Sequence, residues 1–325
     1  MAAFLSENTN HLLLENSPTS LLTTDDLISE VEEHLYGGDR DNLNFLTSPL
    51  NDTETTIQLA DGPSGVTTGS YLGINLEKLY VRAIDPTSGA LTVRRGMLGS
   101  QPTGHDQDSL VYIDPLFDKW SIFRALNVEI ASLSGADNGL FAERAFTTMT
   151  QPVQRTYDVP AANTDLMFIL EIRWDSYGPE RYWAKVDRRQ YEVIRDVQTD
   201  TGTSGMSIRI EDSRIFPGAF TPGRRMVVRY AAGFSPLSRN LADDASLATG
   251  MAATMLDIPA IGAAARLMGV RAAKRTFIER AVGSRRPSEV PAGATAQAAS
   301  VLLALMNARI VSEAERLRQL WPVGN

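Results

Sequence analysis

The sequence predicts a mixed α+β protein in which two β-rich units are followed by a C-terminal helical region. Apolar and polar residues alternate with a period of two over 55–114 and again over 147–234. Over 235–325, in contrast, apolar residues recur every three to four positions. The chain of 325 residues is 43% hydrophobic and 22% charged, which is typical of globular proteins and sufficient for one or two sizeable cores.

Residues 1–54 are predicted to form an N-terminal arm and an acidic helix. Thr23 has the side chain of an N-cap, and Asp25 and Asp26 follow in the first turn, where negative charge is favourable. Apolar residues then recur at helical spacing until two glycines at 37–38 end the pattern. Because the helix is short and strongly acidic, we expect it to lie on the surface rather than in a core.

Residues 55–114 are predicted to form a small antiparallel β-barrel or sandwich module. Short alternating segments, among them 78–84 and 90–93, are separated by turns rich in Gly, Asp and Pro. Residues 115–146 are predicted to form a helix and a linker, with Asp114 and Pro115 at the start of the helix.

A second β-rich unit is predicted over 147–234, as a jelly-roll-like β-sandwich insertion. Residues 166–174 form a long apolar segment, and several later segments alternate. Trp174 and Trp183 in this unit are candidates for stacking on a glycan, as in lectin-like sites. The alternative is that both are half-buried strand residues.

Residues 235–325 are predicted to form a C-terminal helical bundle. Asp243 and Asp244 cap a first segment, Pro259 opens a longer helix that ends at Val282, and residues 294–320 form the last helix. Small residues over 260–265 permit close helix packing. The apolar stripe of the last helix is predicted to consist of Ala298, Val301, Leu302, Leu305, Ile310, Leu317 and Leu320.

The net charge of −8 conceals a gradient along the chain. Residues 1–60 hold eleven acids and one base, whereas residues 257–325 hold ten bases and five acids. Such a division indicates self-association, docking on an oppositely charged partner or contact with nucleic acid, unless the two surfaces are simply solvated.

Two charged sets are therefore candidates for subunit or partner contacts. The basic set is Arg266, Arg271, Lys274, Arg275, Arg280, Arg285 and Arg286, and the acidic set is Asp25, Asp26, Glu30, Glu32 and Glu33. The basic set could instead contact nucleic acid, and we favour pairing with another subunit or an oppositely charged partner.

The residue types present do not indicate catalysis, a metal site or a cofactor. The chain has no Cys, which excludes disulfides, thiolate ligands and thiol nucleophiles, and it has only three His. The segment His105–Asp108 is a candidate cation-binding turn, although two acids in a turn are usually only solvated. We therefore predict no catalytic residue.

No secretory or membrane signal is predicted. The first residues lack a basic segment and a long apolar run. The most apolar helical stretch, 251–270, is interrupted by Asp257, Pro259 and Arg266. We expect a soluble protein that is made in the cytoplasm.

One set of spaced residues resembles a small β-module that is common in structural proteins of tailed phages. The matching residues are Ile74 to Glu77, Tyr80, Val81, Leu91 to Gly96, Leu98 to Ser100, and His105 to Val111. Ser100 stands where the module usually has Thr, and Asn75 where Gly or Asp is usual. The module occurs in connector, tail and fibre proteins alike.

A second set resembles the ending of head-to-tail connector proteins, also called adaptor or neck proteins, of tailed bacteriophages. The strand Val227–Phe234 is followed by a loop and by the segment Ile258–Ala265. Phe234 stands where Tyr is usual. The two resemblances together cover about half of the chain, taking each as a supersecondary unit.

The connector resemblance implies a structural virion protein without catalysis. It implies a homo-oligomeric ring, usually of twelve subunits, that is built by the helical region 235–325 and binds the portal and the tail or neck proteins. Double-stranded DNA would pass through the lumen without sequence-specific contact, and no membrane would be involved. The basic set could line this channel, but tight phosphate contacts would impede the passage of DNA, so we favour its pairing with a subunit or the portal. The alternative is a tail or baseplate protein with a glycan-binding β-sandwich. A cell-wall hydrolase would need paired acids in a cleft, and no motif supports it.

Overall fold

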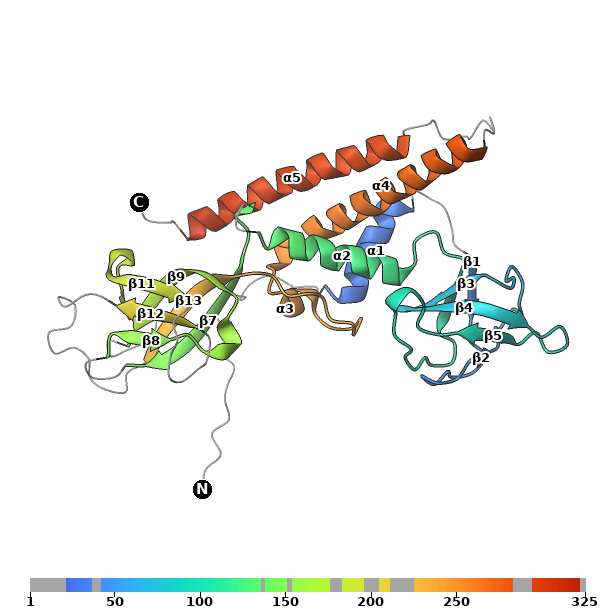
Figure 1. Cartoon of the computed structure of the whole chain (residues 1–325), viewed down its shortest axis with the longest axis horizontal. Helices are drawn as coiled ribbons and strands as arrows, with labels where there is room; N and C mark the ends of the chain where they lie inside the picture. The colour runs from blue at the N-terminus through green and yellow to red at the C-terminus, as the bar shows by residue number, and fades with distance from the viewer. Residues whose placement is uncertain are drawn as a thin grey trace, which may run out of the picture.

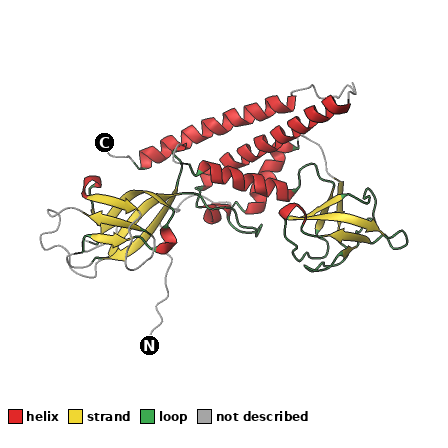
Figure 2. Cartoon of the chain, in the orientation of Figure 1, coloured by secondary structure: helices red, strands yellow, loops and turns green. Residues whose placement is uncertain are grey.

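The computed structural model describes residues 22–36, 42–135, 138–150, 154–175, 183–195, 205–210, 225–282 and 294–321, without the side chains of 272–282 and 294–295. The structure is mixed α+β and its sheets are antiparallel. Figure 1 shows a layer of helices at the centre, a curled sheet at one end and the remaining strands at the other. Figure 2 shows the same separation of helices from strands.

The first β-unit is a six-stranded antiparallel sheet that curls into a half-barrel. Its strand order is β1-β6-β3-β4-β5-β2. The strands are β1 (Asn42–Phe45), β2 (Thr56–Ile57), β3 (Tyr71–Ile74), β4 (Glu77–Ile84), β5 (Leu91–Arg94) and β6 (Leu110–Ile113). A bridge between Leu46 and Leu59 brings the two ends of the sheet together. Because β1 pairs with β6, the unit begins at Asn42 and not at residue 55 as predicted.

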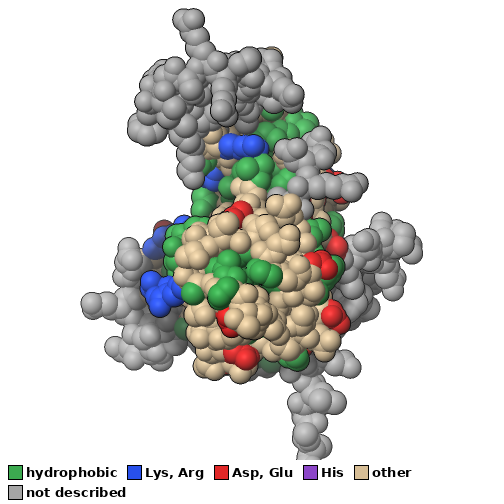
Figure 3. Space-filling model, turned by 90° about the vertical axis from the view of Figure 1, so that its right-hand side faces the viewer, with side chains coloured by type: hydrophobic (Ala, Val, Ile, Leu, Met, Phe, Trp, Pro, Cys, Tyr) green, Lys and Arg blue, Asp and Glu red, His purple; other side chains and the backbone are tan. Residues whose placement is uncertain are grey.

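The inward face of the half-barrel follows the alternation in the sequence. Along β4, Glu77, Leu79 and Val81 are buried, whereas the residues between them are partly exposed. Together with residues from the neighbouring strands they form a separate hydrophobic core. The end of the half-barrel that faces the viewer in Figure 3 has hydrophobic side chains at its centre and acidic side chains towards its right margin.

The second β-unit consists of two antiparallel sheets. One has the order β10-β9-β13-β7 and the other β11-β12-β8. The strands are β7 (Ala142–Met149), β8 (Thr156–Asp158), β9 (Leu166–Trp174), β10 (Ala184–Lys185), β11 (Tyr191–Arg195), β12 (Met206–Ile210) and β13 (Arg225–Ala232). The unit begins at Ala142 and not at 147, because β7 pairs along its whole length with β13. Residues of both sheets and of the helices belong to one hydrophobic core.

The helices are α1 (Thr24–Leu35), α2 (Lys119–Leu133), α3 (Ala245–Thr249), α4 (Asp257–Val282) and α5 (Ala294–Leu320). Short 3-10 helices are η1 (Met97–Gly99), η3 (Ala161–Asn163), η5 (Arg188–Gln190) and η6 (Ala253–Met255). The start of α2 differs from the prediction: its N-cap is Asp118, whose carboxylate accepts a hydrogen bond from the Ser121 N–H, and not Asp114. The caps Thr23 on α1 and Asp244 on α3 are confirmed.

Helix α4 is the centre of the helical layer. It packs against α5 on one side and against α1 and α2 on the other, as Figure 1 shows. Its residues 258–265 are all buried, so this part of α4 has no solvent-exposed face. The stretch Ala253–Arg271 is long and apolar enough to span a membrane, but 56% of its most apolar window is buried inside the structure, as in the core helix of a soluble protein.

The prediction that α1 is a surface helix is wrong. Leu27, Ile28 and Val31 are fully buried in the main core, and Leu35 is almost fully buried. The acidic residues occupy the opposite side of the same helix, so the high charge of α1 does not prevent burial of its apolar face.

The apolar stripe predicted for α5 combined residues from the buried face and from the exposed face of the helix. Leu302, Ile310 and Leu317 pack against the core as predicted. The other predicted members, Ala298, Val301, Leu305 and Leu320, are exposed. The buried face is completed by Ala299, Met306, Glu313 and Ala314 instead.

Candidate functional site

Three residues of the β-module signature meet in the interior of the half-barrel. Glu77 opens β4, Arg95 follows β5, and His105 lies in the loop before β6. The Arg95 Nε donates to Glu77 Oε1 at 2.7 Å, and His105 Nε2 lies 2.9 Å from Glu77 Oε2. The side chains of Glu77, Arg95 and His105 are 0%, 5% and 1% exposed, respectively. We call these three residues the buried charge cluster.

The buried charge cluster joins segments that are distant in the sequence. Besides Glu77, the Arg95 guanidinium contacts the carbonyl oxygens of Asn51, Glu54 and Thr103. The Thr103 N–H donates in turn to Glu77 Oε2 at 3.2 Å. One guanidinium therefore holds the loop before β2, the start of β4 and the loop before β6 together, which favours a structural role.

The pKa of Glu77 reflects these contacts. Burial alone raises the pKa of the carboxyl, but hydrogen bonds from Arg95, His105 and the Thr103 N–H outweigh it and lower the pKa to about 2. Glu77 is therefore ionised at neutral pH and forms a buried ion pair with Arg95.

Gly96, which follows Arg95, is required by the local backbone. Its φ angle of 63° lies in the left-handed region, and a Cβ atom there would lie 3.0 Å from Pro102 Cδ. Its N–H points to Glu77 Oε1 at 3.4 Å. The Arg–Gly pair of the signature thus has a geometric reason.

The interpretation of His105–Asp108 as a cation-binding turn is not supported by the geometry. His105 is buried and directed to Glu77, whereas Asp106 and Asp108 are exposed. Within the described residues, no group of three His, Asp or Glu side chains is arranged to hold a metal ion.

The alternation of apolar and polar residues contains a signal for the buried charge cluster. Glu77, Leu79 and Val81 are every second residue of β4, so their side chains point to the same face of the sheet. An inward-facing carboxylate could therefore have been inferred for β4. An inward carboxylate requires a buried cation, and Arg95 is the base that follows the inward Val93 on β5.

The acidic set on α1 is partly used within the chain. Asp25 forms an ion pair with Lys119 on α2 at 2.6 Å. Asp26 forms a capping box with Thr23, and the hydrogen bonds from Thr23 lower the pKa of the Asp26 carboxyl. These two carboxylates stabilise the start of α1 and its contact with α2.

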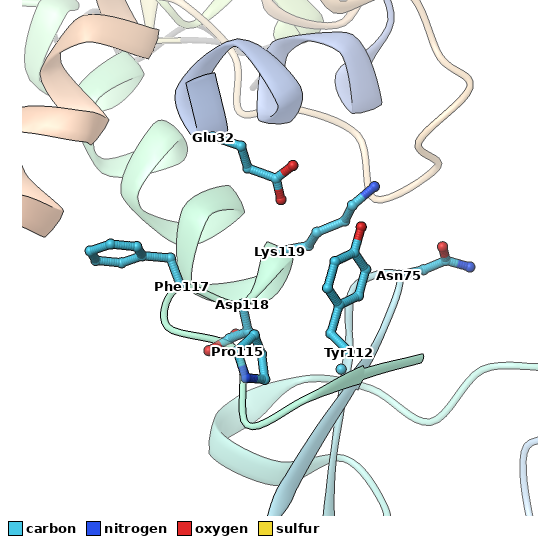
Figure 4. Close-up of a pocket in the computed structure, with 8 residues that line it drawn as sticks. Glu32, Asn75, Tyr112, Pro115, Phe117, Asp118 and Lys119 are labelled. Carbon is cyan, nitrogen blue, oxygen red and sulfur yellow. The ribbon is translucent and has the colours of Figure 1, made fainter. Parts of the chain in front are cut away.

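The other three acids differ in their surroundings. Burial, and secondarily the negative charge of Asp257, raises the pKa of Glu30. Glu33 is exposed, and Glu32 lines a small pocket between α1, α2 and the half-barrel. Figure 4 shows Glu32, Lys119 and Tyr112 around this pocket. The pocket has essentially no room for a ligand.

The basic set on α4 is only partly within the described residues. Arg266 forms an ion pair with Glu129 of α2 at 2.5 Å, and Arg271 is exposed with its Cζ 5.8 Å from the centre of the Phe117 ring. Lys274, Arg275 and Arg280 lie on α4, but their side chains are outside the described part, and so are Arg285 and Arg286 altogether. Packing of α1 on α4 thus brings parts of both sets into the same helical layer.

A second pocket lies where the half-barrel meets the helical layer. It has a volume of about 320 Å³ and is lined by residues that include Trp120, Arg239 and Leu241. The indole N–H of Trp120 donates to the Leu98 carbonyl oxygen at 3.1 Å, and Arg239 lies over the indole ring. The volume is at the lower limit of ligand pockets, which are about 300–1,000 Å³, and no paired acids lie in it.

The two tryptophans do not form an exposed platform for a sugar. Trp183 is only 7% exposed, and the Arg225 guanidinium lies 5.7 Å from its ring centre. Trp174 is partly buried and packs against the main core. Their burial favours the alternative of structural residues within the second β-unit, with Trp174 at the end of β9 and Trp183 directly before β10.

The geometry therefore describes a buried charge cluster and two charged sets that are partly paired within the chain. No known protein family model matches the sequence, and no curated protein matches it.

Proposed function

We propose that this chain is a structural virion protein, the head-to-tail adaptor of a tailed bacteriophage. It forms a ring, a dodecamer by its resemblance to connector proteins, between the portal and the tail or neck proteins. The ring continues the DNA channel, and double-stranded DNA passes through it without sequence-specific contact. The protein acts without catalysis, metal or cofactor.

The observation that carries the proposal is the convergence of the signature residues in the half-barrel. Glu77, Arg95 and His105 are 10 to 28 positions apart in the sequence, and yet they share one buried hydrogen-bond network. Gly96 also has a backbone conformation that requires glycine. Since each position has a structural reason, the resemblance to the phage β-module is supported by physical constraints and not by composition alone.

The connector-like ending has a corresponding position in the fold. Strand β13 contains most of the first part of this signature, and residues 258–265 of α4 form the second part. The small residues over 260–265 allow α1, α2 and α5 to surround the start of α4. We infer that these helices form a bundle that builds the body of the ring, and that the two sheets of the second β-unit form one sandwich.

The charged sets would then contact neighbouring subunits or the portal. Arg271 is exposed near the end of the part of α4 with described side chains, and Glu33 is exposed on α1. Charge complementarity of this kind increases association rates and weakens with salt.

The test combines the purified chain with the portal protein of the same phage. We expect a ring in negative-stain images, bound to the portal, and a multiple of the monomer mass. Arg271→Glu should weaken portal binding or ring formation, whereas Arg82→Glu, the same change at an exposed position on β4, should leave both intact. A strictly monomeric chain without affinity for the portal would overturn the proposal.

A further inference from the structure

Helix α5 carries a second apolar stripe on the face that points away from the core. Val301 is 63% exposed and Val311 is 68% exposed, and Ala304 and Ala308 between them are exposed as well. These four residues lie within one sector of the helix, opposite the buried Met306 and Leu317. Figure 1 shows α5 at the outer boundary of the helical layer.

The order of residues on this outer face is a palindrome. The exposed positions run Gln297, Ser300, Val301, Ala304, and then Ala308, Val311, Ser312, Glu315. Reflection about position 306 places Val opposite Val, Ala opposite Ala and Ser opposite Ser, with Gln297 opposite Glu315. All eight residues are exposed.

A palindromic helix face is complementary to itself in an antiparallel pair related by a two-fold axis. The small residues Ala304 and Ala308 at the centre permit close approach of two helices, and the two valines pack outside them. Gln297 and Glu315 meet at the rim, where an amide can donate to a carboxylate.

The charges of α5 agree with this antiparallel register. Residues 294–308 contain no charged side chain, and Arg309, Glu313 and Arg316 form ion pairs on the inner side of the helix. Glu315 and Arg318, both exposed, are the charged residues of the outer face between 296 and 320. In an antiparallel pair they face the uncharged half of the other copy, whereas in a parallel pair each would face its own counterpart of like charge.

The exposed area is of the size that marks an interaction site. Val301 and Val311 of the stripe and Leu305 at its margin, at 63%, 68% and 46% exposure, leave on the order of 300 Å² of apolar surface in water. A standard interface buries roughly 800 Å² on each partner, so the stripe supplies somewhat more than a third of one and the polar rim supplies part of the rest. Lipid is a poorer occupant, because the stripe has no aromatic or Lys residue that would anchor it in a membrane.

We propose that the outer face of α5 binds the same face of a second copy of this chain, as an antiparallel two-fold dimer. A two-fold contact closes after two copies. It is therefore separate from the head-to-tail contacts that a ring requires, and it goes beyond the proposed function.

The test measures the mass of the free protein by analytical ultracentrifugation from about 1 to 50 μM, a range that covers moderate affinities. We expect a concentration-dependent dimer for the natural sequence. Ala304→Arg and Ala308→Glu should each raise the dissociation constant at least about 100-fold, because each buries an unpaired charge. Gln319→Arg, on the same helix but beyond the overlapping residues, is the matched control and should leave the dimer intact.

Mixing the two disruptive variants tests the register. Arg at 304 in one copy faces Glu at 308 in the other, so A304R and A308E should form a dimer together although neither does so alone. Because the chain has no Cys, A304C mixed with A308C should also form an oxidised cross-link, whereas A304C mixed with Q319C should not.

The results that would overturn the dimer are distinct from those that concern the adaptor. A monomer throughout the concentration range, with or without binding of the stripe to phosphatidylcholine–phosphatidylglycerol vesicles, contradicts the dimer. A dimer that A304R leaves unchanged, with circular dichroism showing native folding, also contradicts it. Portal binding by A304R is measured in parallel, and its presence or absence bears only on the adaptor function.

Discussion

Replacing Glu77 by Gln tests whether the buried charge cluster holds the half-barrel together. The substitution keeps the size of the side chain but leaves the Arg95 guanidinium, which is 5% exposed, without its carboxylate partner. Breaking a buried ion pair from one side costs about 3–5 kcal/mol. We expect E77Q to lower the free energy of unfolding of the half-barrel by about this amount at pH 7.

The lowered pKa of Glu77 corresponds to a similar stabilisation of the folded half-barrel. The value is about 2 in the folded protein and 4.5 ordinarily, a difference of about 2.5 units that corresponds to about 3 kcal/mol. Because the folded pKa is the lower one, this stabilisation is fully present above about pH 4.5 and is lost as the pH falls towards 2. The difference between E77Q and the natural protein should therefore shrink between about pH 5 and pH 2.5.

Hydrogen exchange measured by mass spectrometry is the appropriate assay, because it reports opening of the half-barrel separately from the rest of the chain. We expect E77Q to reduce protection of the amides in β4 and β5, and to leave α4 unchanged. Glu54→Gln is the matched control, since Glu54 is exposed in the same unit. Equal protection of β4 in E77Q and the natural protein at pH 7, or a difference that stays constant down to pH 2.5, would refute the reasoning.

Two further predictions concern packing and capping in the helical layer. Gly269→Ala should raise the free energy of unfolding by up to about 1 kcal/mol, because nothing lies within 4 Å of the new Cβ. Gly262→Ala should raise it less or lower it, because the new Cβ would lie 2.9 Å from Met306 Sδ. Urea denaturation of both variants checks this order of stability, and the reverse order would contradict it. Asp118→Ala removes the N-cap of α2 and the partner of Lys78 at 2.7 Å, and should cost about 2–4 kcal/mol, measured by the same method. A loss below about 0.5 kcal/mol would show that neither contact stabilises the structure.

Local structure followed from the sequence where a single residue type determines it. The N-cap Thr23, the cap Asp244 and the helix over Ala294–Leu320 all occur as predicted, because each depends on a side chain and its nearest neighbours. The start of α2 was misplaced because Asp114 and Asp118 are both capable of capping, but the Asp114 carboxylate accepts a hydrogen bond from the Tyr71 N–H of β3, whereas Asp118 caps α2 and pairs with Lys78 of β4.

The remaining errors arose where the partner of a face is distant in the sequence. The acidic residues of α1 indicated a surface helix, but Leu27 and Ile28 belong to the main core, and α1 packs on α4, which lies more than 200 positions later. Likewise, the stripe predicted for α5 joined Leu302, which faces the core, to Val301, which faces solvent. Adjacent apolar residues on a helix point about 100° apart, and only the position of α4 shows which of them is buried.

The charge gradient and the palindrome on α5 lead to opposite expectations for salt. Several charges at the two ends of the gradient are already paired within the chain, Asp25 with Lys119 and Arg266 with Glu129. Exposed charges such as Arg271 and Glu33 remain for docking on a partner, and screening at high salt should weaken that contact. The centre of the α5 stripe, in contrast, is apolar and holds no charge, so added sulfate should leave a dimer intact or strengthen it. Salt therefore separates the two modes of association: an assembly that dissociates at high salt uses the charged faces, and a dimer that persists uses α5.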